Sequence, residues 1–242
     1  MSSTPDNQQK QIQIPINERS NYVLPFNYGW VETKLTQEAI DHLWKCIDNK
    51  QEDHRDQLVG QVSHSFALKD TGNKFLTDTL NPLIKDYNEN NGHWQRPPIT
   101  NPCTVYLKDM WVNYQYKHEF NPPHNHAGVY SFVIWMKIPT TSKEQNELPN
   151  AKGSNGPQNS AFYITYSDIF GQFHTHLKQM NPDCEGTMLF FPSALVHGVN
   201  PFYNCDEPRI SISGNLFLDP EIEYDSTPPQ VVPVAKSPMK TL

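Results

Sequence analysis

The sequence predicts a mainly-β protein, a double-stranded β-helix (jelly roll) with supporting helices near the N-terminus. Two helix-patterned segments come first in the chain. From residue 103 onward, short runs rich in β-branched and aromatic residues alternate with Pro, Gly, Asn and Asp. Such runs, separated by turn residues, are typical of antiparallel sandwiches and barrels. A chain of 242 residues is long enough to form one well-filled domain of this class.

Two segments have the spacing of amphipathic helices. In residues 36–49, apolar side chains recur at i, i+3, i+4 and i+7, and Thr36 is placed to cap the N-terminus. These apolar residues are Ile40, Leu43, Trp44 and Ile47. A second helical stretch is expected over residues 74–88. Pro82 interrupts this stretch, so a kink or two short helices are expected there.

Seven runs are predicted as strands: residues 104–107, 110–116, 128–138, 161–166, 187–191, 197–200 and 209–218. The polar stretch 140–159 is predicted to be a mobile loop that lines part of a substrate pocket, because a loop of this length inside a compact domain is usually functional. Large aromatic residues of the predicted strands are expected to serve packing only; they are Trp111, Trp135, Phe190 and Phe191.

The predicted domain spans residues 26–218. Residues 1–25 are polar and rich in Gln and Asn, which predicts a flexible N-terminal arm. Residues 219–242 hold five prolines and few large apolar side chains, which predicts an extended or disordered tail.

Charge and cysteine usage limit the partners and the compartment. The 26 Asp and Glu residues outnumber the 19 Lys and Arg residues, and this excess disfavours nucleic acid as a partner. Neither a membrane-spanning run nor a secretory signal is present, so no membrane association is expected. The cysteines are scattered, without the paired spacing of a disulfide framework or a CxxC zinc site. A reducing, cytoplasmic location is therefore predicted.

A histidine pair and a later single histidine form the strongest functional pattern. His124 and His126 stand at i and i+2, so on an extended strand both side chains project from the same face. His197 follows 71 residues after His126. A mononuclear iron(II) site takes about three protein ligands on one face of an octahedron. We therefore predict that His124, His126 and His197 are the metal ligands and the catalytic centre of such a site.

A cationic motif follows the last histidine. Arg209 lies twelve residues after His197, and Ser211 follows at i+2 on the same face. A guanidinium binds a carboxylate through two parallel charge-assisted bonds, and a hydroxyl can add a third. Tyr114, ten residues before His124, is placed to bring a phenol to the same acid. Arg209, Ser211 and Tyr114 are predicted to bind an acidic cosubstrate.

The motifs WVNYQYKHEFNPPHNHAGVYSFVIWMKIP, LFFPSALVHGVNP and RISISGN resemble the 2-oxoglutarate/Fe(II) (2OG-Fe(II)) oxygenases of bacteria and marine phages. The resemblance covers residues 55–218. It implies a jelly-roll fold, Fe(II) at His124 and His197, and 2-oxoglutarate held by Arg209 and Ser211. It also implies the reaction: 2-oxoglutarate is decarboxylated to succinate and CO2 while O2 hydroxylates a second substrate, either a peptide or protein side chain or a small molecule.

One position departs from the broader superfamily, which has Asp or Glu two residues after the first histidine where this chain has His126. Three neutral imidazoles would leave the metal more positive than two imidazoles and a carboxylate. The three-histidine site is favoured, but two other ligand sets remain open. Glu119 or Asp168 could supply a carboxylate from elsewhere. Alternatively, His126 is the first ligand and Gly128 occupies the carboxylate position, leaving that position vacant.

Other polar residues have simpler explanations. His174 and His176 have the same i, i+2 spacing without a companion motif, so both are expected on the surface. Taken alone, an arginine such as Arg209 more often forms a structural ion pair, here with Asp206 or Glu207.

Two other functions compete with the oxygenase hypothesis. A cupin-type dioxygenase without 2-oxoglutarate is suggested by HxH and by the spacing of Gly186, Pro192 and His197. The first cupin motif continues with a Glu, however, where this chain has Tyr130 and Ser131. The second alternative is a jelly-roll binding or structural module without catalysis.

Overall fold

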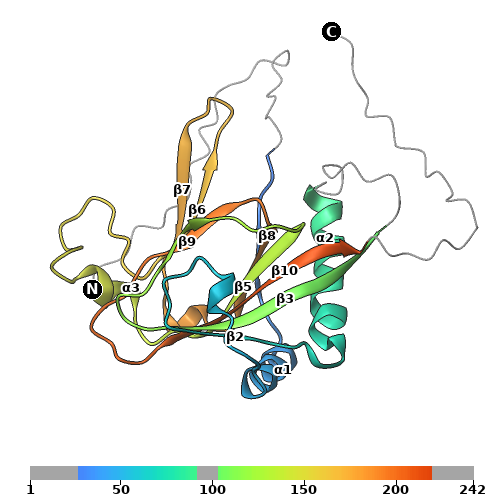
Figure 1. Cartoon of the computed structure of the whole chain (residues 1–242). Coiled ribbons are helices and arrows are strands. Elements are labelled where there is room, and N and C mark those ends of the chain that lie inside the picture. Colours follow the sequence, from blue (N-terminus) through green and yellow to red (C-terminus); the bar gives the residue numbers. More distant parts are fainter. Residues whose placement is uncertain (1–26, 92–102, 220–242) are drawn as a thin grey trace, which may run out of the picture.

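The computed structural model describes residues 27–91 and 103–219 (Figure 1). The predicted arm, residues 1–25, lies outside the described residues, and so does the predicted tail apart from Asp219. The predicted domain boundaries therefore stay predictions. No helix in the described part of the chain is both long and apolar enough to cross a membrane.

Two antiparallel sheets form the body of the molecule. Their strands are β1 (Val31–Lys34), β2 (His64–Ala67), β3 (Thr104–Gln115), β4 (Asn121–His124), β5 (Tyr130–Lys137), β6 (Phe162–Ser167), β7 (Phe173–Lys178), β8 (Thr187–Pro192), β9 (Val196–Val199) and β10 (Arg209–Asp219). One sheet has the order β1-β8-β5-β10-β3-β2, and the other has the order β4-β9-β6-β7. The consecutive strands β3 to β10 thus divide into the sets β3-β10-β5-β8 and β4-β9-β6-β7. This is the topology of a double-stranded β-helix, and it confirms the predicted fold class.

Each of the seven predicted runs overlaps a strand to within two residues at its ends, and the first two runs merge into β3. The strands β1, β2, β4 and β7 were not predicted. The first three have four residues each, too few to carry a clear period. In addition, β4 contains Pro122 and Pro123, which a strand tolerates here because β4 lies at a sheet edge.

The helices begin and end close to the predicted positions. Helix α1 (Gln37–Asp48) is capped by Thr36, whose hydroxyl accepts from the Ala39 amide at 3.3 Å. The second stretch is a π-helical turn (Leu76–Leu80) that runs directly into α2 (Asn81–Asn91). The predicted break at Pro82 therefore takes the form of a change of helix type. A π turn shifts the carbonyl register just before the residue that cannot donate a hydrogen bond.

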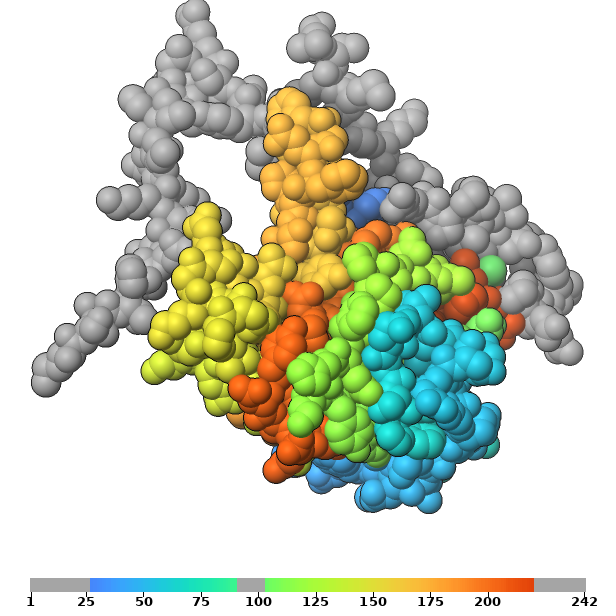
Figure 2. Space-filling model, turned by 60° about the vertical axis from the view of Figure 1, so that its left-hand side comes forward, coloured from blue at the N-terminus to red at the C-terminus, as the bar shows by residue number. Residues whose placement is uncertain are grey.

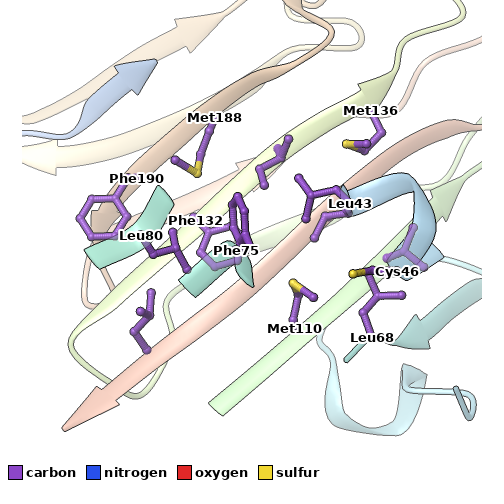
Figure 3. Packing of buried hydrophobic residues seen from close by; sticks show 14 of the residues in the cluster. Leu43, Cys46, Leu68, Phe75, Leu80, Met110, Phe132, Met136, Met188 and Phe190 are labelled. Atoms are coloured by element: carbon purple, nitrogen blue, oxygen red, sulfur yellow. The ribbon is translucent and has the colours of Figure 1, made fainter. Parts of the chain in front are cut away.

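The core has two parts, one on each face of the six-stranded sheet. On one face the helices pack on the sheet, and Figure 3 shows Leu43 of α1 and Phe75 close to Phe132 of β5. On the other face the two sheets pack together around residues such as Trp135 and Phe162. Side chains alternate along each strand, so the central strands β5 and β8 contribute to both parts, for example through Phe132 and Val133 of β5.

The stretch 140–159 is not a plain loop, contrary to prediction. It contains a short helix, α3 (Ser142–Asn146), which starts with a complete capping box between Thr141 and Glu144. The Gln145 side chain is buried, and it bonds the backbone of Tyr203 in both directions, at 2.8 Å each. In Figure 2 this region forms the yellow lobe, beside the protruding orange hairpin of β6 and β7.

Candidate active site

Three histidines converge between the two sheets. His124 ends β4 and pairs with His197 of β9 across the smaller sheet. His126 lies just beyond the end of β4, and its backbone N–H donates to Ser193 O at 2.9 Å. One ring nitrogen from each of the three histidines lies within 4.8 Å of the others, and the Nε2 atoms of His126 and His197 are 3.3 Å apart. The pair thus meets His197 as predicted, although only His124 belongs to the strand.

Backbone carbonyls orient two of these rings. His124 Nδ1 lies 2.7 Å from Pro122 O, and His197 Nδ1 lies 2.9 Å from Leu195 O. A carbonyl oxygen only accepts, so both Nδ1 atoms carry the proton. The Nε2 atoms of His124 and His197 are then left with lone pairs. Metal-binding histidines are usually oriented by a hydrogen bond of this kind.

The site strongly favours neutral imidazoles. Burial, and to a smaller extent repulsion by His124, lowers the pKa of His126 to about 4 and that of His197 to about 3. Burial also lowers the pKa of His124, against the effect of the Pro122 carbonyl. At neutral pH the three rings are therefore uncharged, which is the form that binds metal ions.

Acidification should destabilise the metal-free protein. In the unfolded chain a histidine takes up its proton near pH 6.5, whereas the folded pKa values of His126 and His197 lie near 4 and 3. The stability due to neutral burial is present above pH 6.5 and is lost as the pH falls toward those values. We expect the free energy of unfolding to fall by about 2 kcal/mol or more between pH 6.5 and pH 5. Urea unfolding of chelator-treated protein at the two pH values would measure this, and an unchanged midpoint would contradict it. In His176→Gln, which changes an exposed histidine, the dependence should persist.

No carboxylate joins this cluster among the described residues. Glu119 binds the backbone amides of Ser63 and Tyr116 at 2.9 and 2.8 Å, and Asp168 pairs with His174 at the exposed β6–β7 hairpin. The structure therefore brings neither of the two proposed carboxylates to the histidines. The same hairpin leaves His174 exposed, as expected for a surface residue.

Gly128 has a backbone explanation. Its φ is +105°, and a Cβ at this position would lie 2.7 Å from Leu216 O. Glycine is thus required by the turn that leads from the histidines into β5. Since His124 also stands in the cluster, the arrangement with a vacant ligand position receives no support from the geometry.

Arg209 is fully buried at the start of β10, and neutral groups surround its guanidinium. Its Nε and one terminal nitrogen donate to Gln115 Oε1 at 3.1 and 2.9 Å, and the other terminal nitrogen donates to Ser160 O at 2.7 Å. No acidic side chain within residues 27–91 and 103–219 pairs with it, and burial alone lowers its pKa to about 9. A structural ion pair is excluded in particular for Asp206 and Glu207, which pair with lysines.

A narrow cavity joins Arg209 to His197. Its lining includes His197, Arg209 and Ser211, so Ser211 lies where it was predicted. A larger pocket of about 450 Å³ adjoins this cavity and is lined by His124 and His126. Asn113 lines both spaces. His124, His126, His197, Arg209 and Ser211 thus line one hollow between the sheets, which is made up of these two neighbouring spaces.

Tyr114 does not reach this hollow. Its ring packs on the helix-covered face of the six-stranded sheet, where it contacts Phe66 at 6.1 Å between ring centroids. Side chains of β3 alternate between the two faces, so Asn113 and Gln115 point to the site and Tyr114 points away from it. The residues of β3 that face the site are therefore Asn113 and Gln115, the two neighbours of Tyr114, and not Tyr114 itself.

Sequence reasoning missed three polar residues of β3 and its surroundings. Asn113 and Gln115 are both 6% exposed, and neither is an expected residue for a buried strand. That pattern, two amides at i and i+2 within an apolar run, was the available signal. Ser160, whose carbonyl accepts from Arg209, directly follows the stretch 140–159 that was predicted to be mobile.

One of the four large aromatic residues that were predicted to serve packing only, Trp111, also lines a pocket. Trp135, Phe190 and Phe191 are buried in the core as predicted. Trp111 is also buried, but it lines the larger pocket, and its ring centroid lies 6.0 Å from that of His126. Its role is therefore not packing alone.

Comparison with known proteins finds one family match. Residues 109–215 match the family model described as "Putative 2OG-Fe(II) oxygenase". This span begins in β3 and ends in β10, so it contains the strands of the jelly roll. No curated protein matches the chain.

Several solved structures are similar to the chain at low identity. An oxidoreductase of the 2OG-Fe(II) oxygenase family from Burkholderia pseudomallei has 11% identity and a TM-score of 0.48, with 78% of this chain and 84% of that chain covered. A prolyl-4-hydroxylase from Pseudomonas putida has 14% identity and a TM-score of 0.47, covering 79% and 94%. A prolyl hydroxylase from Trichoplax adhaerens, in complex with a hypoxia-inducible-factor peptide fragment, has 12% identity and a TM-score of 0.48, covering 78% and 83%.

The family match gives no support to a cupin-type dioxygenase or to a non-catalytic module. Residues 109–215 thus match a 2OG-Fe(II) oxygenase family, and this match supports an oxygenase that depends on Fe(II), 2-oxoglutarate and O2.

Proposed function

We propose that His124, His126 and His197 bind Fe(II), and that Arg209 with Ser211 binds the distal carboxylate of 2-oxoglutarate. The proposed reaction is hydroxylation of a second substrate, coupled to decarboxylation of 2-oxoglutarate to succinate and CO2. The observation that carries the proposal is a buried guanidinium that has no acidic partner among the described residues and shares a narrow cavity with His197, one of three clustered neutral imidazoles.

The fit of the histidines to Fe(II) supports the first part. Two nitrogens bound at right angles to one ion, each about 2.1 Å from it, lie about 3.0 Å apart. The Nε2 atoms of His126 and His197 are already 3.3 Å apart. The lone pair on His197 Nε2 is available because Nδ1 donates to a carbonyl. Phe162 and Phe191 pack against the His197 ring at centroid distances of 5.8 and 4.8 Å, which holds its orientation and excludes water from that side.

The charge balance supports the second part. Three neutral imidazoles do not reduce the charge of a divalent ion, and Arg209 adds a buried positive charge without a counterion among the described residues. A dicarboxylate that spans the two ends would offset both charges in a region of low dielectric constant. We infer that charge compensation in this site depends on the negative charge of 2-oxoglutarate more than it would in a site where a protein carboxylate binds the metal.

Asn113 has unsatisfied hydrogen-bonding capacity between these two ends. Its Oδ1 is buried without a partner. The two amide atoms of an asparagine can exchange places by rotation of the side chain, so either a donor or an acceptor can be presented to the cavity. We propose that the Asn113 amide donates to 2-oxoglutarate, because a dicarboxylate only accepts.

The residues of the site then have separate roles. The bound Fe(II) and 2-oxoglutarate supply the activation of O2 for oxidation of the substrate. The imidazoles hold the ion, and Arg209 determines how far 2-oxoglutarate enters the cavity. Gln115 fixes the plane of the guanidinium, because its Oε1 accepts two hydrogen bonds from Arg209. The main protein contribution is positioning and exclusion of water.

The second substrate is proposed to enter the pocket of about 450 Å³ beside His124 and His126. This volume lies in the range of small-molecule sites. Its walls include Gln57, Asp109 and Trp111. The lining favours a polar group, either a small molecule or a side chain of a peptide or protein. The stretch 140–159, which was predicted to form part of this wall, is not among the lining residues.

Replacement of Asn113 by Leu should separate stability from activity. An unpartnered buried amide costs folding free energy, so an apolar residue of similar size should raise the free energy of unfolding by about 1 kcal/mol. The 2-oxoglutarate KM should rise at the same time, because a donor to the cosubstrate is lost. Urea unfolding of the metal-free variant and succinate formation as a function of 2-oxoglutarate would measure the two effects. An unchanged KM would remove Asn113 from the cosubstrate site.

Anaerobic titration of the purified protein with Fe(II), then with 2-oxoglutarate, tests the proposal as a whole. The expected result is a weak visible metal-to-ligand charge-transfer band that needs both components. Iron binding without the band would contradict the cosubstrate assignment, and no iron binding would contradict the histidine assignment.

We also propose a cytoplasmic location. Cys46, Cys184 and Cys205 are free thiols in the structure. Free thiols persist where the compartment is reducing. Fractionation of the native host would test this proposal.

A further inference from the structure

A second cluster of metal-binding side chains lies on the other face of the six-stranded sheet. His42 and Cys46 stand one turn apart on α1, and Asp70 precedes the π-helical turn. One donor atom from each lies within 4.8 Å of the others. Figure 3 shows Cys46 pointing into the helix-covered core, beside Leu68 and Met110, and thus away from the histidines between the sheets.

The cluster is arranged around a single nitrogen. His42 Nε2 lies 2.7 Å from Asp70 Oδ1 and 3.6 Å from Cys46 Sγ. In the metal-free protein the proton on Nε2 is shared with the carboxylate. A cation at this position would replace that proton and face nitrogen, oxygen and sulfur donors together.

The distances suit a small tetrahedral ion. With bond lengths of about 2.3 Å to sulfur and about 2.0 Å to nitrogen, tetrahedral ligands lie about 3.5 Å apart. The separation of Cys46 Sγ and His42 Nε2 is already 3.6 Å. The contact between His42 and Asp70 would have to lengthen by about half an ångström, as expected when an ion takes the place of a proton.

Backbone amides hold the other two donors in place. Asp70 Oδ1 accepts from the Phe75 amide at 3.0 Å, and Oδ2 accepts from the Leu76 amide at 2.9 Å. Burial raises the pKa of the Cys46 thiol, so a cation would have to displace its proton; the Thr71 amide, which donates to the sulfur, would support the resulting thiolate. Ligating carboxylates and thiolates are commonly supported by such outer hydrogen bonds. Cys46 and Asp70 are only 2% and 8% exposed, so the donors are already desolvated.

An entry path is also present. A cavity of about 520 Å³ lies between α1 and the second helical stretch, and His42 forms part of its wall. An ion can arrive through this cavity, and a water molecule there can complete a fourth position. We propose that His42, Cys46 and Asp70 form a second metal site that binds Zn²⁺ and ties α1 to the start of the second helical stretch. Zn²⁺ is the divalent ion best suited to a mixed sulfur, nitrogen and oxygen set.

Cobalt(II) titration of the full chain under anaerobic, reducing conditions tests this site. The titration uses the His197→Ala background, so its outcome does not depend on the proposed iron site. The expected result is one bound equivalent, with a near-ultraviolet thiolate-to-cobalt charge-transfer band. Cys46→Ser should abolish the band, and Cys184→Ser, a matched change of another free cysteine, should leave it intact.

A second variant guards against a folding defect in Cys46→Ser. Asp70→Asn keeps the size of the side chain and one of its two bonds from the backbone amides, because only its oxygen can accept, and it should weaken cobalt binding by about tenfold or more. Zn²⁺ should also raise the Tm of the His197→Ala protein and not that of its His42→Gln derivative. Cobalt binding without the thiolate band, or no binding, would overturn the proposal. The role of Asp70 would then be limited to its hydrogen bonds with His42 and with the amides at the start of the helix.

Discussion

Replacement of His197 by Ala should abolish both Fe(II) binding and 2-oxoglutarate turnover. His197 is 5% exposed and is the member of the cluster whose Nε2 approaches that of His126. Loss of an outer hydrogen-bond partner of a metal ligand typically costs about 10- to 100-fold in metal affinity or activity. Loss of the ligand itself should exceed this range. Anaerobic equilibrium dialysis with Fe(II), and succinate formation under saturating 2-oxoglutarate, would measure the two effects.

His176→Ala is the matched control for this change. His176 also belongs to an H-x-H pair and lies on a strand, but it is exposed on β7. Iron binding and turnover should both match the wild type. Residual turnover in His197→Ala above the level without added iron would remove His197 from the proposed ligand set. Circular dichroism of both variants should show the native β signal.

Replacement of Arg209 by Met should raise the 2-oxoglutarate requirement strongly while iron binding persists. Met keeps much of the buried volume but removes the charge and the fork of donors. Hydrogen bonds to a charged group contribute roughly 1.5 to 3 kcal/mol each, so the loss of two predicts a rise in KM of about 100-fold or more. The charge-transfer band should need a correspondingly higher 2-oxoglutarate concentration.

The Arg209 side chain also has a structural role, which affects the interpretation of this variant. Arg209 also donates to Gln115 and to the Ser160 carbonyl, so its loss leaves buried acceptors unpaired and should lower stability. Arg209→Lys keeps the charge but not the fork, and it should give an intermediate KM. Arg55→Met, which removes an exposed arginine paired with Asp53, should change nothing. An unchanged KM in an Arg209→Met protein that still binds iron would refute the cosubstrate assignment.

Much of the site could be found in the sequence because its signals are local. The spacing of His124 and His126 and the motif Arg209-x-Ser211 are patterns of near neighbours, and the structure places these residues along one hollow. Helix α1 was predictable for the same reason, since its cap and its apolar spacing lie within a few turns.

Other features depended on contacts between distant segments. Which face of β3 meets the site is set by pairing with β10 and β2, and this pairing turns Asn113 inward and Tyr114 outward. An alternating pattern in the sequence has a period but no reference for which side is the inside. Short edge strands such as β4 are likewise stabilised by their partners more than by their own residues.

The sequence by itself determined the fold class, the histidine pair with its later partner, and the cationic motif, because periodicity and motif spacing are properties of short segments. Only the tertiary structure decided that no carboxylate of the described residues joins the histidines, that neutral groups surround Arg209, and that Asn113 Oδ1 is left without a hydrogen-bond partner. The physical reason is that burial and charge compensation are sums over neighbours. Those neighbours come from strands and loops far apart in the chain, and only the packed sheets bring them together.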